Sequence, residues 1–476
     1  MFNKYFYSFI FGLLLLPYSL ASNASELPVI GNSTSVISLE QEHKLGRTWA
    51  RMLRGSTPEF GDPIVVNYID QLIWQLAPYS QLQDLRLELI VLDNPALNAF
   101  AVPGGIVGIN TGLLLGAQDE EELASVIAHE LAHLSQRHYA QQLEESRRNT
   151  PLLLAGILAS ILVSSASPDA GIAGISSTIA AGQQAGLNFS RRNEQEADRI
   201  GMLNLTSAGY DPFAMPRMFS RIQRSSRFLG EKPPEFLLTH PVTESRIADA
   251  ENRARQLDKP DFRPLNYDFQ LIRKRLEVNY AKDLKQAIKS YKESAADNQL
   301  SNYGLALALM RSKQYKQAAT ALEALAPVLQ QHLTIKLTYA ELALEAGQYT
   351  EALSMTEKLR DLYPDSYPVA HFYANSLQAN NQFKAAAEVL IRLTKQQPTN
   401  SYLWYELAEV EGKAGNTLGI HEARTEYFLL NGQVDKALRQ LDFAMRDKQL
   451  SASDIEQLKQ RKLEAEAIRD DIKNAF

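Results

Sequence analysis

Apolar residues recur at helical spacing across residues 119–141, and a run of acidic residues opens this segment. A helix that packs on a core needs one apolar stripe, and acidic side chains near its N-terminus are favoured by the helix dipole. The pattern therefore predicts a helix over residues 119–141. The apolar stripe consists of Leu123, Val126, Ile127, Leu131 and Leu134.

The second half of the chain carries an internal repeat. A short motif that ends in an aromatic residue starts at equal intervals, at Lys313, Gly347 and Asn381. An interval of this length, with a small residue where two helices cross, is typical of the tetratricopeptide repeat, a helix pair that stacks into a solenoid. The small residue stands three places after each aromatic residue, at Ala318, Ala352 and Ala386.

We expect this solenoid to occupy residues 268–476. Residues 268–300 are candidates for an opening helix pair, and a further, irregular unit at Gly432 follows the unit at Asn381 after a longer interval. Two interpretations of the solenoid remain open. It is either a stack of helices without a partner or a concave surface that grips an extended or helical segment of another protein.

The N-terminus has the pattern of a secretory signal peptide at residues 1–24. Lys4 is the only charge before an apolar run from Phe9 to Leu16, and small residues at Ala21 and Ala24 offer cleavage sites. An uncleaved membrane anchor would need about 18 or more apolar residues. We therefore expect cleavage after Ala21 or Ala24 and a mature chain that is soluble.

The composition of the chain excludes several kinds of partner and site. The net charge of −6 is of the wrong sign for a chain that binds a phosphate backbone, so we expect no nucleic-acid partner. The chain contains no cysteine, which excludes a disulfide framework, a thiolate metal site and a cysteine nucleophile. Any metal must therefore be held by histidines and carboxylates.

The predicted helix carries the motif H-E-x-x-H. His129 and His133 are four residues apart and share one face, so both imidazoles can bind one metal ion. Glu130 stands beside them and can accept the proton of a water molecule that attacks a peptide carbonyl. His138 cannot join from the same helix, because nine residues correspond to about 180° around the axis. The motif favours a metalloprotease over the alternative, a polar helix face with two solvated histidines.

A later segment offers a third ligand, which a catalytic zinc requires. Glu194 and Asp198 are again four residues apart, whereas Glu196 points away from both. One member of the pair can bind the metal while the other accepts a hydrogen bond from a ligand histidine. The alternative, a solvated run of surface charges, explains Glu196 better than it explains the pairing.

Together the two motifs resemble peptidase family M48, whose pattern is H-E-x-x-H on one helix and E-x-x-x-D, commonly ending in Ala-Asp, on a later one. The resemblance implies that Glu194 is the third ligand of one Zn²⁺ ion and that Asp198 supports a ligand histidine. It also implies the fold class, which is mainly α-helical with a small β-sheet. We expect a zincin-like metalloprotease domain at residues 38–257, followed by the tetratricopeptide-repeat solenoid.

Two further residues are candidates for the site, since His240-Pro241 followed by Arg246 also matches the family. His240 is interpreted either as a fourth ligand that closes the zinc site until it is displaced, or as a structural histidine at a helix entry. Arg246 is a candidate for stabilising the oxyanion of the tetrahedral intermediate, and a surface salt bridge is the alternative.

Residues 98–105 and 111–114 match the family as a hairpin and an edge strand beside the cleft. An exposed strand in this region could pair with the backbone of an extended substrate and would recognise main chain rather than sequence. A core strand with a glycine bulge is the alternative. The residues expected to form the substrate edge are Gly104, Gly105, Ile106, Val107 and Gly108.

The apolar segment at residues 151–187 is interrupted by Ser164, Ser165, Ser167, Pro168 and Asp169, and it is too short for a membrane span. We interpret it as a helical hairpin that packs over the catalytic core or makes peripheral contact with a membrane surface.

The order of signal peptide, M48 domain and repeats is similar to that of periplasmic family members that act on outer-membrane β-barrel proteins. The resemblance implies a zinc endopeptidase with a chaperone-like role, whose substrates are unfolded or stalled barrel proteins. It also implies that the solenoid docks on the barrel-assembly machinery. The rival hypothesis is a non-proteolytic chaperone or adaptor with a latched or structural zinc site, in which Glu130 would be dispensable.

Overall fold

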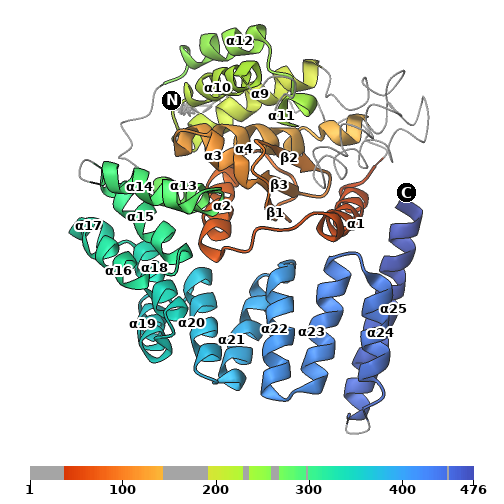
Figure 1. The fold of residues 1–476 in the computed structure, drawn as a ribbon. Coiled ribbons are helices and arrows are strands. Elements are labelled where there is room, and N and C mark those ends of the chain that lie inside the picture. Colours follow the sequence, from red (N-terminus) through yellow and green to blue (C-terminus); the bar gives the residue numbers. More distant parts are fainter. Residues whose placement is uncertain are drawn as a thin grey trace, which may run out of the picture.

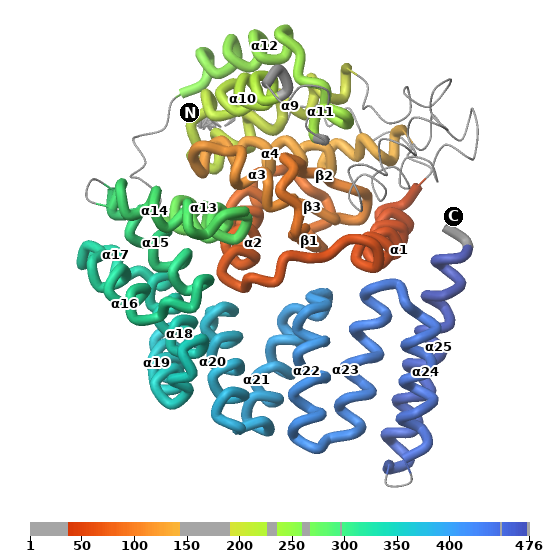
Figure 2. The backbone as a smooth tube through the Cα atoms, in the orientation of Figure 1, coloured from red at the N-terminus to blue at the C-terminus, as the bar shows by residue number. Residues whose placement is uncertain are grey.

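The computed structural model describes residues 37–142, 191–228, 235–258, 267–295, 298–447 and 450–475. These residues are mainly α-helical and include a three-stranded sheet. The sheet-bearing region (residues 37–258) lies inside an arc formed by the later helices (Figure 1; Figure 2). The predicted fold class is confirmed.

The sheet has the strand order β1-β3-β2. Its strands are β1 (Glu88–Leu92), β2 (Ala99–Val102) and β3 (Ile106–Asn110). β3 pairs parallel with β1, so that Glu88 lies opposite Ile106, and it pairs antiparallel with β2. β3 is therefore the middle strand, and β1 and β2 form the two edges.

This order shows that the predicted substrate edge is wrong. Residues 106–108 belong to β3, which has hydrogen-bonded strands on both sides and is buried along its whole length. Gly104 and Gly105 form the preceding turn, with φ values of 80° and 79°. A Cβ atom on Gly104 would lie 2.5 Å from the Glu42 carbonyl of α1 (Leu39–Ser56). These glycines serve a tight turn and a close approach to α1.

Helices cover both faces of the sheet. On one face, Trp49 and Leu53 of α1 pack with Phe100 of β2, and the Trp49 and Phe100 rings meet edge to face at 5.5 Å. The other face packs against α2 (Pro63–Leu76) and α4 (Glu120–Ser135). The remaining helices of this region are η1 (Ala77–Tyr79), α3 (Thr111–Gly116), α9 (Arg191–Ser207), α10 (Ala214–Phe228), α11 (Glu235–Thr239) and α12 (Glu244–Ala254).

The solenoid (residues 267–475) is built of consecutive helices, and the predicted opening pair is present as its first two. They are α13 (Tyr267–Asn279), α14 (Leu284–Ser294), α15 (Gln299–Arg311), α16 (Tyr315–Glu323), α17 (Pro327–Gln330), α18 (Leu333–Glu345), α19 (Tyr349–Leu362), α20 (Tyr367–Ala379), α21 (Phe383–Gln396), α22 (Ser401–Ala414), α23 (Thr417–Leu430), α24 (Val434–Ala444) and α25 (Ala452–Ala475).

The repeated motif forms the turn inside each helix pair. Its first residue adopts a left-handed backbone, with φ of 59° at Lys313, 76° at Gly347 and 61° at Asn381. The glutamine that follows is the N-cap, and the aromatic residue begins the second helix. That helix packs closely on the first, because its small residue is fully buried in every copy: Ala318, Ala352 and Ala386.

The irregular unit at Gly432 is half a period out of step. One further period after Asn381 leads to Gly415, which has φ of 79° and precedes Asn416, the N-cap of α23. Gly432 lies half a period beyond Gly415, has φ of 68° and opens the next turn, between α23 and α24. The period therefore continues at Gly415, and Gly432 marks the connection to the next helix.

The arc contacts the sheet-bearing region at both ends and between them, since α13 and α20 pack against α2 while α23 and α25 pack against α1 (Figure 1). At one end, buried Arg275 of α13 pairs with Asp62, the N-cap of α2, and with Glu341 of α18. At the other end, Lys44 of α1 pairs with Asp471 of α25 at 2.7 Å.

Within the described ranges, no helix is both long enough and apolar enough to cross a bilayer. The predicted signal peptide at residues 1–24 and the apolar segment at residues 151–187 lie outside the described residues.

Candidate metal centre

Two helices in close contact carry the motif residues. α4 begins after Asp119, whose side chain accepts a hydrogen bond from the Glu122 N–H, and α9 packs along α4. Gly201 of α9 permits this approach, because a Cβ atom there would lie 3.0 Å from the Cα of His129. Asp198 and Glu194 precede Gly201 by three and seven residues, so they share its face of α9. The glycine thus brings both carboxylates up to α4.

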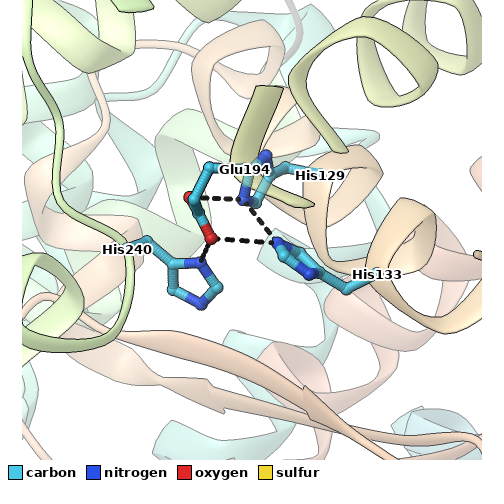
Figure 3. Close-up of side chains that lie close together, drawn as sticks. All are labelled: His129, His133, Glu194 and His240. Carbon is cyan, nitrogen blue, oxygen red and sulfur yellow. Dashed lines mark hydrogen bonds and ion pairs between the residues drawn. The ribbon is translucent and has the colours of Figure 1, made fainter. Parts of the chain in front are cut away.

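The structure brings the four predicted metal ligands together (Figure 3). The ligand atoms of His129, His133, Glu194 and His240 all lie within 4.8 Å of one another, and all four residues are buried. His129 Nε2 is 3.0 Å from His133 Nε2 and 3.7 Å from Glu194 Oε2. His133 Nε2 is 3.5 Å from Glu194 Oε1.

These residues fit a zinc ion. With metal–ligand bonds of about 2.0–2.1 Å, the ligand atoms of a tetrahedral site lie roughly 3.3–3.4 Å apart, close to the spacings found here. Imidazole and carboxylate are donors that zinc accepts. The nearby Glu130 Oε1 is buried and has no hydrogen-bond partner among the described residues. A cation at the centre would balance the carboxylates that converge there.

Arg246 clamps the two acidic residues of α9. Its Nε and Nη2 donate to the Asp198 carboxylate at 2.8 and 2.7 Å, and its Nη1 lies 2.6 Å from Glu194 Oε2 and donates to the Pro241 carbonyl. The predicted oxyanion role is therefore not supported, because all three nitrogens are directed at protein groups. A surface salt bridge is also wrong, since Arg246 is buried. The structure places Arg246 behind the metal ligands.

The ion pairs with Arg246 favour the charged forms of Glu194 and Asp198. Burial alone would raise the pKa of Glu194, but the charges of His240, Arg246 and His129 outweigh it and lower the pKa. Burial also opposes ionisation of Asp198, and hydrogen bonds with His129 and Arg246 lower its pKa overall. Both side chains are thus carboxylates at neutral pH, and Asp198 Oδ1 lies 3.0 Å from His129 Nδ1.

Glu130 has the opposite electrostatic setting. Burial raises its pKa, although His240 and His129 pull in the other direction and the backbone N–H of Ala101 donates to its carboxylate. A general base works best when its pKa lies near the pH of the reaction. The raised pKa therefore suits Glu130 to this role.

The strand next to this carboxylate is β2, which contacts α4. The Asn110 N–H donates to the Asn98 carbonyl, and hydrogen bonding alternates along an antiparallel pair. The main-chain groups of Phe100 therefore face β3, while those of Ala99 and Ala101 face outward, on the side of the bond between Ala101 and Glu130.

His240 reaches the cluster from the residues that follow α11. Its Nδ1 lies 2.9 Å from Glu194 Oε1, and its ring stacks on Phe236 at 4.9 Å. Burial would lower the pKa of His240, but the charges of Glu194 and Glu130 outweigh it and raise the pKa. Its place among the potential ligands agrees with the interpretation of a fourth ligand.

His138 contacts the ligand His133, although helical spacing predicted that it would lie on the opposite side of the helix. α4 ends at Ser135 rather than at residue 141, Arg137 adopts a left-handed backbone with φ of 53°, and a new helical segment begins at His138. His138 is not part of the potential ligand group, as predicted, but its Nδ1 lies 2.9 Å from His133 Nδ1. No sequence signal marked this turn, because left-handed residues other than glycine are uncommon.

Comparisons with known proteins identify the same regions. The model of peptidase family M48 matches residues 63–254, and a tetratricopeptide-repeat model matches residues 343–409. The beta-barrel assembly-enhancing protease of Escherichia coli (strain K12) is 34% identical over 431 residues, which cover 89% of this chain and 88% of that protein. The putative beta-barrel assembly-enhancing protease of Vibrio cholerae is 36% identical over 431 residues, with 89% of each chain covered.

A third relative matches a smaller part of the chain. The mitochondrial metalloendopeptidase OMA1 of Schizosaccharomyces pombe is 31% identical over 199 residues, which cover 40% of this chain and 56% of that protein. The M48 match includes every residue of the cluster and its clamp, from His129 to Arg246. The chain belongs to peptidase family M48, as a zinc metalloendopeptidase that carries tetratricopeptide repeats.

Proposed function

We propose that this protein is a periplasmic endopeptidase with a chaperone-like role in the assembly and quality control of outer-membrane β-barrel proteins. It assists the assembly of these proteins and degrades those that stall. The relatives named beta-barrel assembly-enhancing proteases support this, at 34–36% identity over 89% of the chain. The predicted signal peptide supports export, and the solenoid offers a surface for the barrel-assembly machinery.

The proposed mechanism assigns a role to each side chain. His129, His133 and Glu194 hold the zinc ion, which when bound supplies Lewis-acid chemistry toward a peptide carbonyl. Glu130 accepts the proton of the attacking water and delivers it to the departing amine. Asp198 accepts a hydrogen bond from His129 Nδ1–H and holds that imidazole in place. The observation that carries this mechanism is Glu130, a buried carboxylate of raised pKa beside converging ligands.

The substrate in this proposal pairs with the outer edge of β2 as an extended strand. The outward main-chain groups of Ala99 and the Ala101 carbonyl are suited to this pairing, which recognises main chain rather than side chains. Selection for extended segments fits a role in clearing unfolded chains. Ala101 is only 2% exposed, so the site must open before a substrate enters.

His240 is proposed to close the zinc site as a fourth ligand until it is displaced; we call this residue the latch. A catalytic zinc site keeps one position open, and a buried imidazole 2.9 Å from a ligand oxygen fills the space where a water or substrate would enter. Replacing His240 with alanine should therefore raise the rate of proteolysis. An unchanged or lower rate would count against the latch.

The test compares four purified mature proteins: wild type, Glu130→Gln, His240→Ala and His421→Ala. His421 lies in α23 of the solenoid, is partly buried, and serves as a control for losing a histidine outside the metal centre. Metal content is measured by mass spectrometry, and cleavage is followed on an unfolded outer-membrane β-barrel protein. We expect about one zinc ion per chain in each protein.

The activities separate the hypotheses. Cleavage should fall about 10²–10⁴-fold in Glu130→Gln, rise in His240→Ala and stay unchanged in His421→Ala. Zinc binding without cleavage in any variant would support the chaperone or adaptor instead. Cleavage of casein but not of the barrel protein would retain the peptidase and remove its proposed substrate class.

A further inference from the structure

His138 approaches the metal centre from the side opposite to the zinc position. It follows the left-handed turn at Arg137, whose guanidinium donates to the Glu42 carboxylate at 2.7 Å and to the Ile37 carbonyl at 2.6 Å. These bonds fix the turn against α1. As a result the imidazole of His138 is fully buried beside His133.

The ring atoms define a chain of hydrogen bonds. His133 directs Nε2 at the cluster and Nδ1 at His138 Nδ1, 2.9 Å away. A histidine that binds a metal through Nε2 carries its proton on Nδ1, so His133 is the donor and His138 the acceptor. The proton of His138 is then on Nε2, which lies 3.4 Å from Glu196 Oε2.

The two ligand histidines on α4 are therefore supported differently. His129 meets the buried carboxylate of Asp198 directly. On the Nδ1 side of its ring, His133 meets the imidazole of His138, which lies 3.4 Å from the Glu196 carboxylate, and Glu196 is 33% exposed. A hydrogen bond to a ligand imidazole selects its tautomer and orients its ring, and its loss commonly weakens metal binding 10–100-fold.

We infer that His138 is a positioning residue of the zinc site. It accepts the hydrogen bond of His133 Nδ1–H and thereby fixes the tautomer and ring angle of that ligand, while Glu196 orients His138. Glu196, which the spacing along α9 leaves outside the ligand pair, thus supports the metal centre through His138. The inference concerns the zinc site alone and does not depend on the substrate or the cellular role.

The test measures metal binding, not activity alone. His138→Leu removes the acceptor and keeps the size, whereas His138→Asn places an oxygen near the former Nδ1 position. His371→Leu is the control, because it removes a buried histidine from α20 of the solenoid. For each full-length protein, zinc affinity is measured by chelator competition, the ligand field by the visible spectrum of the Co²⁺-substituted protein, and stability by thermal unfolding of the metal-free form.

We expect His138→Leu to lose zinc affinity about 10–100-fold and to shift the Co²⁺ spectrum, while the melting temperature of the metal-free form changes little. His138→Asn should recover most of the affinity and the spectrum, and Glu196→Gln should lose only a few-fold. Wild-type affinity and spectrum in His138→Leu would overturn the inference. So would equal losses in His138→Asn and His138→Leu that follow the stability of the metal-free protein, because they would indicate a purely structural role.

Discussion

The metal centre and the helix crossings of the solenoid are both buried, but opposite kinds of contact hold them together. In the metal centre, Arg246 lies within hydrogen-bond distance of both Glu194 and Asp198, and the three side chains are at most 10% exposed. In the solenoid, the helix crossings depend on alanines that are fully buried. A buried charge requires its partner, whereas an apolar crossing requires only that the space be filled correctly.

This difference determines how each region responds to change. Removing one charge from the metal centre leaves the remaining charges uncompensated, so the damage spreads through the whole cluster. A change in one repeat affects that repeat and its neighbours, because solenoid units contact only adjacent units. The two regions should therefore be separable by mutation.

The largest effect is expected from Arg246→Met. This change leaves Glu194 and Asp198 buried without their cation, and it should lower the free energy of unfolding of the metal-free protein by about 3–5 kcal/mol. Chemical denaturation followed by circular dichroism measures the loss. Arg255→Met, at the exposed C-cap of the same helix, is the control and should have almost no effect. Equal stabilities for the two variants would contradict the electrostatic account.

A smaller effect is expected from Arg275→Met, where a charge contact joins the two regions. Arg275 is 7% exposed, but its partners Asp62 and Glu341 are 19% and 25% exposed, so water can stabilise them once the cation is gone. We expect a loss of about 2–3 kcal/mol. Zinc release and helix unfolding, followed together during heating, should separate into two transitions. A single coincident transition would show that Arg275 does not couple the regions.

Overpacking tests the solenoid alone. Ala386→Leu places a larger side chain in a fully buried helix crossing and should destabilise the protein by about 1–3 kcal/mol. Zinc affinity should stay at the wild-type value. Ala452→Leu makes the same change at an exposed position. A loss of zinc affinity in Ala386→Leu would show that the two regions are not separable.

The smallest effect is expected at Asp70, which faces a cavity of about 350 Å³ between α2 and the solenoid. Burial raises its pKa, and a hydrogen bond from Trp74 offsets this only in part. A raised pKa in the folded state means that its stabilising contribution is present below the unfolded pKa and is lost as pH rises through the folded value. Asp70→Asn should thus be more stable than wild type at pH 7, by at most about 1 kcal/mol, and equal to it near pH 3. A less stable variant at pH 7 would reverse the sign.

The sequence predicted most of the solenoid because its fold is local. A fixed period, a small residue and an aromatic residue describe each helix pair, and Ala318 and Ala352 occupy the crossings as expected. The prediction of a repeat unit at Gly432 is wrong by half a period. A left-handed residue at this position connects α23 to α24 and so resembles the turn inside a helix pair.

Helical geometry predicted two pairs of residues in the metal centre, and the family resemblance joined these pairs and added His240. Spacing of four residues placed His129 with His133, and Glu194 with Asp198. The clamp by Arg246 depends on how α12 packs against α9, and the position of His138 depends on a left-handed arginine held by Glu42. The order of the strands, which places β3 in the middle of the sheet rather than at an edge, is likewise a long-range property that no local pattern specifies.

Ion pairs join the arc of helices to the sheet-bearing region at both of its ends, and these two ion pairs differ in exposure. A free solenoid is an elastic element, since small rotations between units add up to large changes of curvature. Here α13 is fastened by a buried ion pair at Arg275, whereas α25 is fastened by Lys44 and Asp471, whose side chains are 64% and 30% exposed. Exposed ion pairs contribute about 0–1 kcal/mol. The ion pair at α25 is therefore the weaker of the two, and we expect the C-terminal end of the arc to separate from α1 more easily than α13 separates from α2.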